Sequence, residues 1–387
     1  MALSLPLTRE SRNLVFCGML IAGIVFGYLH WFNSRKQNAA RQFALASLNG
    51  DAPAATMDGM HPCMLSPFSS GGEKPTVTRC ATPTVHRGAV DEFEVDLRYG
   101  AFEVRQTDLE VKDVFDVPLT RTYVAQDWVG GNQVQEFGRN TNHPYDIAPQ
   151  GTRNPYTWMQ LTLEDGEFLY FKRVSQGTGF VDAVYQHTET STSFYKSTIN
   201  WNGNGWTLQL RDGEEMSFPE SYSAKNLAQG AATEIRDAQG NRLGLKRDWR
   251  RNLEEIQTPH GHWIKFTYDD QSRIIWAKDD AGNWAGYVYN GGGMLTDVVH
   301  SSGQARHYVY SGSLMTEVQD GQGHVLLRNT YRGNVLAEQV YPNGDSYRYQ
   351  YVWSANRRYA IRATITMPDG SKREVEPANT VPERFRK

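Results

Sequence analysis

Tyrosines at one repeated place in the C-terminal part of the chain are the residues whose type and spacing could do chemistry. Successive segments carry them at the same position: Tyr268, Tyr289, Tyr310, Tyr331 and Tyr351. On an exposed face, these rings would stack on sugar rings while their hydroxyls form hydrogen bonds with the sugar. On a buried face, they would be the packing contact between neighbouring segments. We favour the packing interpretation, and glycan binding is the alternative.

Other chemically capable residues give weaker patterns. His260 and His262 lie two residues apart beside a turn, and Asp279-Asp280 precedes a turn glycine without the spaced acidic ladder of a calcium loop. The sequence lacks the nucleophile elbow Gly-x-Ser-x-Gly, the phosphate-binding loop and the motifs His-Glu-x-x-His and Cys-x-x-Cys. We therefore expect no catalytic centre, no metal ion and no cofactor.

The elements that position the tyrosines repeat about every 21 residues. The repeats are marked by six glycines at spacings of 21, 21, 21, 20 and 21 residues: Gly240, Gly261, Gly282, Gly303, Gly323 and Gly344. Each lies in a polar turn context, where glycine adopts a positive φ without steric cost. The pattern aromatic-x-Tyr, as in Phe266 and Tyr268, places both rings on one face of a strand. Two repeats are degenerate, because Leu245 and Arg247 replace the aromatics of the first and Asn329 stands near the aromatic position of the fifth.

Each repeat predicts two antiparallel strands. The tyrosine is followed by a second turn, such as residues 290–293, and then by an apolar strand such as Leu295 to Val299. Successive repeats should pair into one long, coiling sheet of β-hairpins. We expect these repeats over residues 235–375 and a β-rich N-terminal part of the same region over residues 91–234. The predicted fold class is mainly β, with one N-terminal transmembrane helix.

The repeat frame resembles the bacterial YD-repeat, or Rhs, family. Its consensus is a glycine followed by an aromatic residue, a tyrosine and an aspartate, and Tyr268-Asp269 is the clearest match to the last two. The stretch from Asp108 to Tyr123, whose last strand ends in Thr-Arg-x-Tyr, also resembles the segment that commonly opens such repeat regions. The resemblance implies an exported or surface-exposed protein, here a short, membrane-anchored member of the family.

The N-terminal part predicts a membrane anchor and a spacer. After an N-terminal tail of residues 1–13, residues 14–32 contain no Asp, Glu, Lys or Arg and are long enough to cross a hydrocarbon core. No cleavage site follows, so we expect an uncleaved signal anchor rather than a signal peptide. Residues 33–90 read as a flexible spacer, and residues 376–387 as a tail. In an oxidising compartment, Cys63 and Cys80 could form a disulfide; two unpaired thiols are the alternative.

Charge and architecture together limit the function. The chain has 40 basic and 43 acidic residues, which excludes a strong nucleic-acid footprint. We expect a single-pass membrane protein whose bulk lies outside the cytoplasm, in the periplasm or at the cell surface. There it would act as a non-catalytic binding or structural module whose partner is cell-wall glycan or an envelope protein. Alternatives are an accessory of an Rhs-type polymorphic-toxin or secretion system, and a glycan-processing enzyme with a carboxylate pair.

Overall fold

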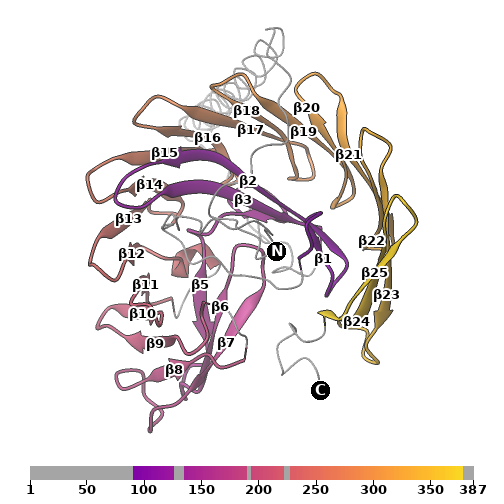
Figure 1. Ribbon diagram of the computed structural model, residues 1–387. Coiled ribbons are helices and arrows are strands. Elements are labelled where there is room, and N and C mark those ends of the chain that lie inside the picture. The colour runs from indigo at the N-terminus through magenta and orange to yellow at the C-terminus, as the bar shows by residue number, and fades with distance from the viewer. Residues whose placement is uncertain (1–89, 126–134, 190–192, 222–226, 378–387) are drawn as a thin grey trace, which may run out of the picture. The chain divides into compact units, whose positions relative to one another are not determined.

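The computed structural model describes residues 90–125, 135–189, 193–221 and 227–377, and nearly all of their regular structure is β (Figure 1). The predicted anchor over residues 14–32, the spacer up to residue 89, and both Cys63 and Cys80 lie outside these residues. Within the described ranges, no helix combines the length and apolar character that crossing a bilayer requires.

One antiparallel sheet runs through most of this region. It has 21 strands, β5 to β25, and each strand from β5 to β24 pairs with the next strand in sequence. The strands are β5 (Ala148–Gly151), β6 (Trp158–Thr162), β7 (Phe168–Arg173), β8 (Val184–Gln186), β9 (Thr198–Trp201), β10 (Gly205–Gln209), β11 (Glu215–Pro219), β12 (Glu234–Arg236), β13 (Arg242–Arg247), β14 (Leu253–Gln257), β15 (Trp263–Tyr268), β16 (Ile274–Asp279), β17 (Trp284–Tyr289), β18 (Leu295–His300), β19 (Ala305–Ser311), β20 (Leu314–Asp320), β21 (Val325–Arg332), β22 (Val335–Val340), β23 (Ser346–Trp353), β24 (Ala360–Thr366) and β25 (Lys372–Val375). A short 3-10 helix, η2 (Leu227–Gly230), precedes β12. The predicted mainly β fold with hairpins in one long antiparallel sheet is confirmed.

A second sheet of four strands precedes the long one in sequence. Its order is β1-β2-β3-β4, and the strands are β1 (Val95–Asp96), β2 (Ala101–Val111), β3 (Val117–Val124) and β4 (Thr141–Asn142). Strand β2 contacts β16, β17 and β22 of the long sheet. We call residues 90–125 and 135–147 the inner segment. The β-rich stretch predicted over residues 91–234 therefore contributes to two different sheets.

The six repeat glycines lie at hairpin turns, as their spacing predicts. Their φ angles lie between +84° and +95°. A Cβ atom at any of them would meet nothing within 4 Å, so the backbone conformation alone requires glycine there. Gly166 and Gly213, upstream of the repeats, also have positive φ, and the aromatics that follow them, Phe171 and Phe218, are buried. The upstream hairpins thus share the local design of the repeats but not their period.

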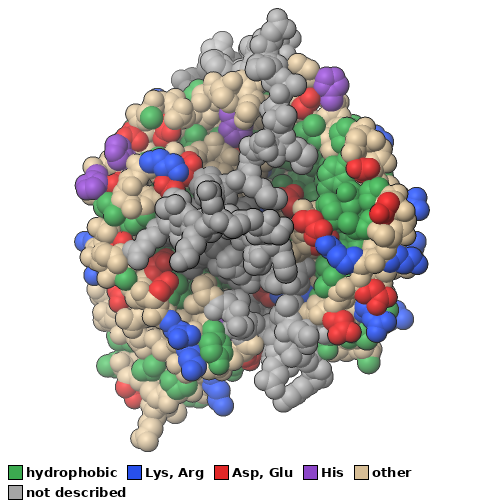
Figure 2. Space-filling view, viewed as in Figure 1, with side chains coloured by type: hydrophobic (Ala, Val, Ile, Leu, Met, Phe, Trp, Pro, Cys, Tyr) green, Lys and Arg blue, Asp and Glu red, His purple; other side chains and the backbone are tan. Residues whose placement is uncertain are grey.

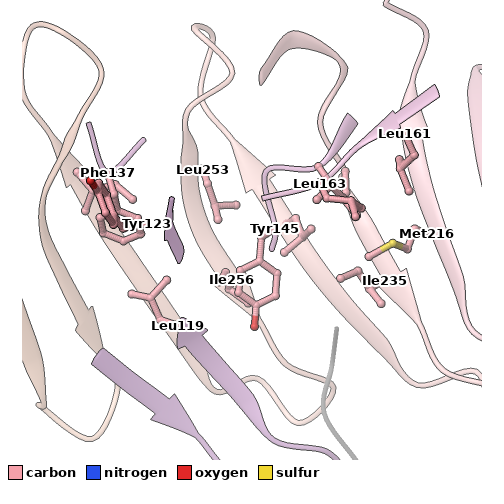
Figure 3. Packing of buried hydrophobic residues seen from close by; sticks show 14 of the residues in the cluster. Leu119, Tyr123, Phe137, Tyr145, Leu161, Leu163, Met216, Ile235, Leu253 and Ile256 are labelled. Carbon is pink, nitrogen blue, oxygen red and sulfur yellow. The ribbon is translucent and has the colours of Figure 1, made fainter. Parts of the chain in front are cut away.

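Alternation along the strands creates a buried inner face and a solvated outer face. In β15, Ile264 and Phe266 are buried while Lys265 and Thr267 are exposed. The inner faces of both sheets form one hydrophobic core. In Figure 3, Leu119 of β3 and Leu253 of β14 both point into this layer. The inner segment is therefore part of the core that the repeats build.

Ion pairs link neighbouring strands on the outer face. Lys265 lies 3.6 Å from Glu255, and Arg348 lies 2.9 Å from Glu338. Acidic and basic side chains intermingle over the described surface in Figure 2. Exposed pairs of this kind add little stability. Their main consequence is a strongly solvated outer face.

Candidate functional site

One residue per repeat, lying opposite a β-bulge, organises the inner face of the long sheet. Next to the tyrosine position the register shifts, and the pairs at the shift recur: Arg247 with Leu253, Tyr268 with Ile274, Tyr289 with Leu295, Tyr310 with Met315, Tyr331 with Leu336, and Trp353 with Ala360. We name the second member of each pair the bulge-partner residue. Because a bulge removes main-chain groups from the sheet ladder, these groups need other partners.

The carbonyl groups of four of the six bulge-partner residues accept a hydrogen bond from the tyrosine of the following repeat. The pairs are Tyr268 Oη with Leu253 O (2.9 Å), Tyr289 Oη with Ile274 O (2.6 Å), Tyr310 Oη with Leu295 O (2.8 Å) and Tyr331 Oη with Met315 O (2.8 Å). Burial raises the pKa of all four hydroxyls. These tyrosines tie each repeat to the one before it, which supports the packing interpretation of the tyrosine row.

The N–H groups of five of the six bulge-partner residues face the inner segment and donate hydrogen bonds to it. The donors and acceptors are Leu253 N with Glu136 Oε1 (3.2 Å), Ile274 N with Glu136 O (2.7 Å), Met315 N with Tyr123 Oη (2.9 Å), Leu336 N with Gly100 O (2.8 Å) and Ala360 N with Arg98 O (2.7 Å). Ala232, 21 residues before Leu253, donates in the same way to Ile147 O at 3.1 Å. The repeats thus present a line of main-chain donors that holds polypeptide largely independently of its side chains.

The degenerate repeats keep this geometry with other side chains. Arg247 replaces the tyrosine of the first repeat, and its Nε donates to Ala232 O at 3.0 Å. That acceptor lies 15 residues earlier, the same offset that separates Tyr268 from Leu253. In the fifth repeat, Asn329 Nδ2 donates to Met315 O at 3.2 Å alongside the tyrosine. Both replacements therefore preserve a donor to the bulge-partner carbonyl.

A buried cluster of ionisable groups joins the inner segment to the first repeats. His143 Nε2 lies 2.6 Å from Glu136 Oε2, and the Tyr268 hydroxyl, which has a single proton to donate, lies 2.9 Å from this oxygen as well as from Leu253 O. Arg247 lies 3.7 Å from Glu136 and 3.3 Å from Asp146. Burial raises the pKa of Asp146 to about 6, and the charge of Glu136 adds to this rise. Burial acts on Glu136 in the same direction, but His143 and Arg247 bring its pKa below the ordinary value.

Opposite pKa shifts on neighbouring carboxyl groups are typical of acid–base pairs in active sites. Here, however, the partners of Glu136 and Asp146 are groups of the same chain, and both residues are buried, at 4% and 8% exposed. The arrangement is suited to fixing the inner segment against the repeats.

A second buried ion pair joins strand β3 to the middle repeats. Arg121 contacts both carboxylate oxygens of Asp108, at 2.5 Å and 2.9 Å. Tyr287 Oη donates to Asp108 at 2.8 Å, and Tyr308 Oη accepts from Arg121 at 3.4 Å. Tyr287 and Tyr308 are the first aromatics of their repeats, so both aromatic positions of the repeat contact polar groups that hold the structure together.

The remaining predicted residues lie apart from this line. The Tyr351 hydroxyl is buried and has no hydrogen-bond partner among the described residues. His260 lies 2.5 Å from Asp113, and His262 lies 2.7 Å from Asp280. Nowhere in the described ranges do three or more His, Cys, Asp or Glu side chains gather in a way that could hold a metal ion.

The residues of the inner segment that dock on the repeats are absent from the sequence-based prediction. Tyr123 Oη donates to Ser313 O at 2.7 Å and accepts from Met315 N. The only signal in the sequence is the stretch from Asp108 to Tyr123, which resembles the segment that commonly opens YD-repeat regions. This signal predicts the strand that contains Tyr123. It does not predict the contacts of that strand with Ser313 and Met315, because residues so far apart in sequence leave no pattern in either segment.

Comparisons with known proteins give only distant structural similarity. No family model and no curated protein matches the chain. Similar solved structures include TcdB2-TccC3 without its hypervariable C-terminal region, at 12% identity and a TM-score of 0.31, covering 68% of this chain and 16% of that one. The Tc holotoxin pore of Photorhabdus luminescens matches at 11% identity and a TM-score of 0.29, covering 69% of this chain and 15% of that one. This chain therefore spans less than a fifth of the length of either structure.

Proposed function

We propose that this chain is a YD/Rhs-type repeat protein that acts as a non-catalytic structural and binding module at the cell envelope. Residues 14–32 hold it in the membrane, and the repeat region lies outside the cytoplasm. The observation that carries the proposal is the double use of the bulge-partner residues. Four of their six carbonyl groups bond one repeat to the next, and five of their N–H groups bond the repeats to the inner segment.

The polar groups on the inner face support a structural rather than a chemical role. Asp108 is paired with Arg121, and Glu136 with His143. The rings of the tyrosine row are half-buried against the core. We therefore place the binding of cell-wall glycan or an envelope protein on the outside of the module rather than on this row.

Recognition of a second polypeptide, as in an accessory of an Rhs-type secretion system, is a second candidate function. It is favoured by the line of main-chain donors, because the groups that these N–H donors bind are mostly main-chain carbonyls, which every polypeptide has. In this chain the line is occupied by the inner segment. A partner polypeptide would therefore have to bind next to the inner segment or displace it from the donors.

Cell fractionation of the full chain in a bacterial host tests the envelope role. We expect the protein in the membrane fraction and the repeat region digestible by protease added to spheroplasts. Replacing Ile21 and Ile24 by arginine should move the protein to the soluble fraction, because charged residues at the centre of an apolar segment oppose insertion. Matched replacements of Leu3 and Leu5, outside that segment, should not. A full chain found in the cytoplasmic soluble fraction would contradict the proposal.

The same purified protein, kept in detergent, separates the two classes of partner. Sedimentation with isolated peptidoglycan is expected if the partner is glycan. Chemical crosslinking in cells to one envelope protein, without sedimentation, would favour the polypeptide partner. If the protein neither sediments with peptidoglycan nor crosslinks to an envelope protein, only the structural role remains.

A further inference from the structure

The strands of the long sheet are joined by two rows of turns, one at each end of the strands. We call these two rows the edges of the sheet, and they differ in chemistry. Because consecutive strands are antiparallel, the connections between them alternate between the two edges. One edge carries the turns of the six repeat glycines. The other, which we call the second-turn edge, carries the turns that follow the repeat tyrosines and the earlier connections in phase with them, such as β5–β6 and β7–β8.

Exposed apolar side chains gather at the second-turn edge. Seven large apolar side chains are exposed in the described part of the chain, and six lie in connections of this edge or within two residues of one. These are Val174 (58%), Phe180 (39%), Val181 (72%), Trp249 (84%), Val352 (52%) and Ile361 (41%). These side chains belong to three separate turns of this edge, β7–β8, β13–β14 and β23–β24. Exposed apolar residues scattered over a surface are ordinary, and it is their restriction to one edge that sets these apart.

Trp249 has no folding role in its turn. Asp248 Oδ1 accepts hydrogen bonds from the N–H groups two and four residues further on, at 2.7 Å and 2.9 Å. Asp269 and Asn290 build the next two second turns in the same way. The residues at the Trp249 position of those turns are Asp270 and Gly291. The turn therefore forms without tryptophan, and its indole is presented to the outside on a rigid backbone.

Exposed arginines accompany the apolar residues at this edge. Arg250 and Arg251 follow Trp249, and the Arg250 guanidinium lies 4.8 Å from the centre of the indole ring. Three further exposed arginines lie next to Val352 and Ile361: Arg357, Arg358 and Arg362. The turns of the glycine edge carry mainly acidic residues instead: Asp212, Glu214, Asp237, Asp280, Asp320, Asp345 and Asp369. The glycine edge is thus acidic, whereas the second-turn edge is apolar and of mixed charge: its exposed arginines are concentrated in the β13–β14 and β23–β24 turns, and its acidic residues Asp182, Asp248, Asp269 and Asp270 lie in the β7–β8, β13–β14 and β15–β16 turns.

We propose that the second-turn edge docks on an anionic phospholipid surface, with Trp249 in the headgroup region and Arg250, Arg251, Arg357 and Arg358 on lipid phosphates. Tryptophan prefers the membrane–water interface, and arginine binds phosphate oxygens in a bidentate way. A cation close to an anionic surface strengthens association about fivefold. The inference rests on the proposed envelope role only for the presence of a bilayer, since it concerns a surface distinct from residues 14–32.

The test is depth-dependent fluorescence quenching of the full chain reconstituted in vesicles. The vesicles contain phosphatidylglycerol with brominated acyl chains, and the controls contain brominated phosphatidylcholine alone. In the wild-type protein, the brominated lipid should quench one component of the tryptophan fluorescence. This component should be absent in Trp249→Phe and retained in Trp276→Phe, because Trp276 is half-buried and lies away from this edge. Arg250→Gln with Arg251→Gln should reduce that component by up to roughly 25-fold, because each arginine contributes about fivefold.

Each outcome decides the proposal. Equal quenching in wild type and Trp249→Phe would overturn it, as would equal quenching on phosphatidylcholine, which would mean apolar contact without recognition of anionic lipid. Absence of the component on both vesicles would exclude lipid docking and make an acidic protein surface the fitting partner. The readout follows Trp249 and not the anchor, so failure of the anchor in cells is distinguishable from failure of this surface.

Discussion

At the scale of a single residue, the hydroxyl of a repeat tyrosine contributes to stability in addition to its packed ring. Tyr310 Oη donates at 2.8 Å to the carbonyl of Leu295, a residue that is 1% exposed. Tyr310→Phe keeps the ring and leaves a buried carbonyl without its donor. We expect a loss of about 1–2 kcal/mol in the free energy of unfolding, measured by urea denaturation monitored by circular dichroism.

Tyr351→Phe is the matched control for this prediction. Its hydroxyl is buried without a hydrogen-bond partner among the described residues, so its removal should be neutral or slightly stabilising. If both variants lost the same stability, the cost would come from removing a buried hydroxyl as such and not from losing its hydrogen bond.

The sequence predicts the position of these tyrosines but not what their hydroxyls do. The spacing of Gly261 and Tyr268 indicates a turn and a strand face, because both depend on local backbone geometry. The acceptor of Tyr268 is the carbonyl of Leu253, which lies opposite the register shift at Lys246 and Arg247. A bulge carries no reliable residue signature, so this part of the design emerges only in the structure.

At the scale of elements, the inner segment approaches the repeats so closely that backbone meets backbone. Gly138 has a φ of +84°, and a Cβ added to it would lie 2.4 Å from Gly293 O. Arg139 N also donates to that oxygen at 2.9 Å. Gly138→Ala should therefore destabilise the protein by about 2–4 kcal/mol, from the strained φ and from overpacking together.

Gly303→Ala isolates the conformational part of this cost. Its φ is +85°, nearly the same as that of Gly138, but an added Cβ meets nothing within 4 Å. We expect a loss of about 1–2 kcal/mol from the backbone conformation alone. Equal losses in the two variants, compared by thermal or urea unfolding, would show that the inner segment is not held tightly at Gly138.

The existence of two sheets lies beyond what the sequence pattern could predict. Strands β2 and β3 show the same apolar and aromatic composition as β5 to β12, so residues 91–234 read as one β-rich region. Their separation depends on contacts between residues far apart in sequence, such as Arg121 with Tyr308. Periodicity reports which face of a strand is buried but not which sheet buries it.

At the scale of the whole molecule, the inner segment should make the repeats cooperative. A repeat array with contacts only between neighbours opens progressively from its ends. Here the amides of Ile274, Leu336 and Ala360, which lie in different repeats, all donate to the inner segment. We expect these three amides to exchange with solvent at nearly the same free energy in native-state hydrogen exchange, because opening any of them requires release of a shared element.

Gly138→Ala tests this cooperativity at a distance. The substitution strains the inner segment beside Gly293, far in sequence from Leu336 and Ala360. If the segment and the repeats open as one unit, all three amides should lose the same protection, equal to the change in global stability, whereas Gly303→Ala should lower them by its smaller amount. Loss of protection confined to Ile274, whose acceptor Glu136 is two residues from the substitution, would mean that each repeat holds its part of the inner segment independently.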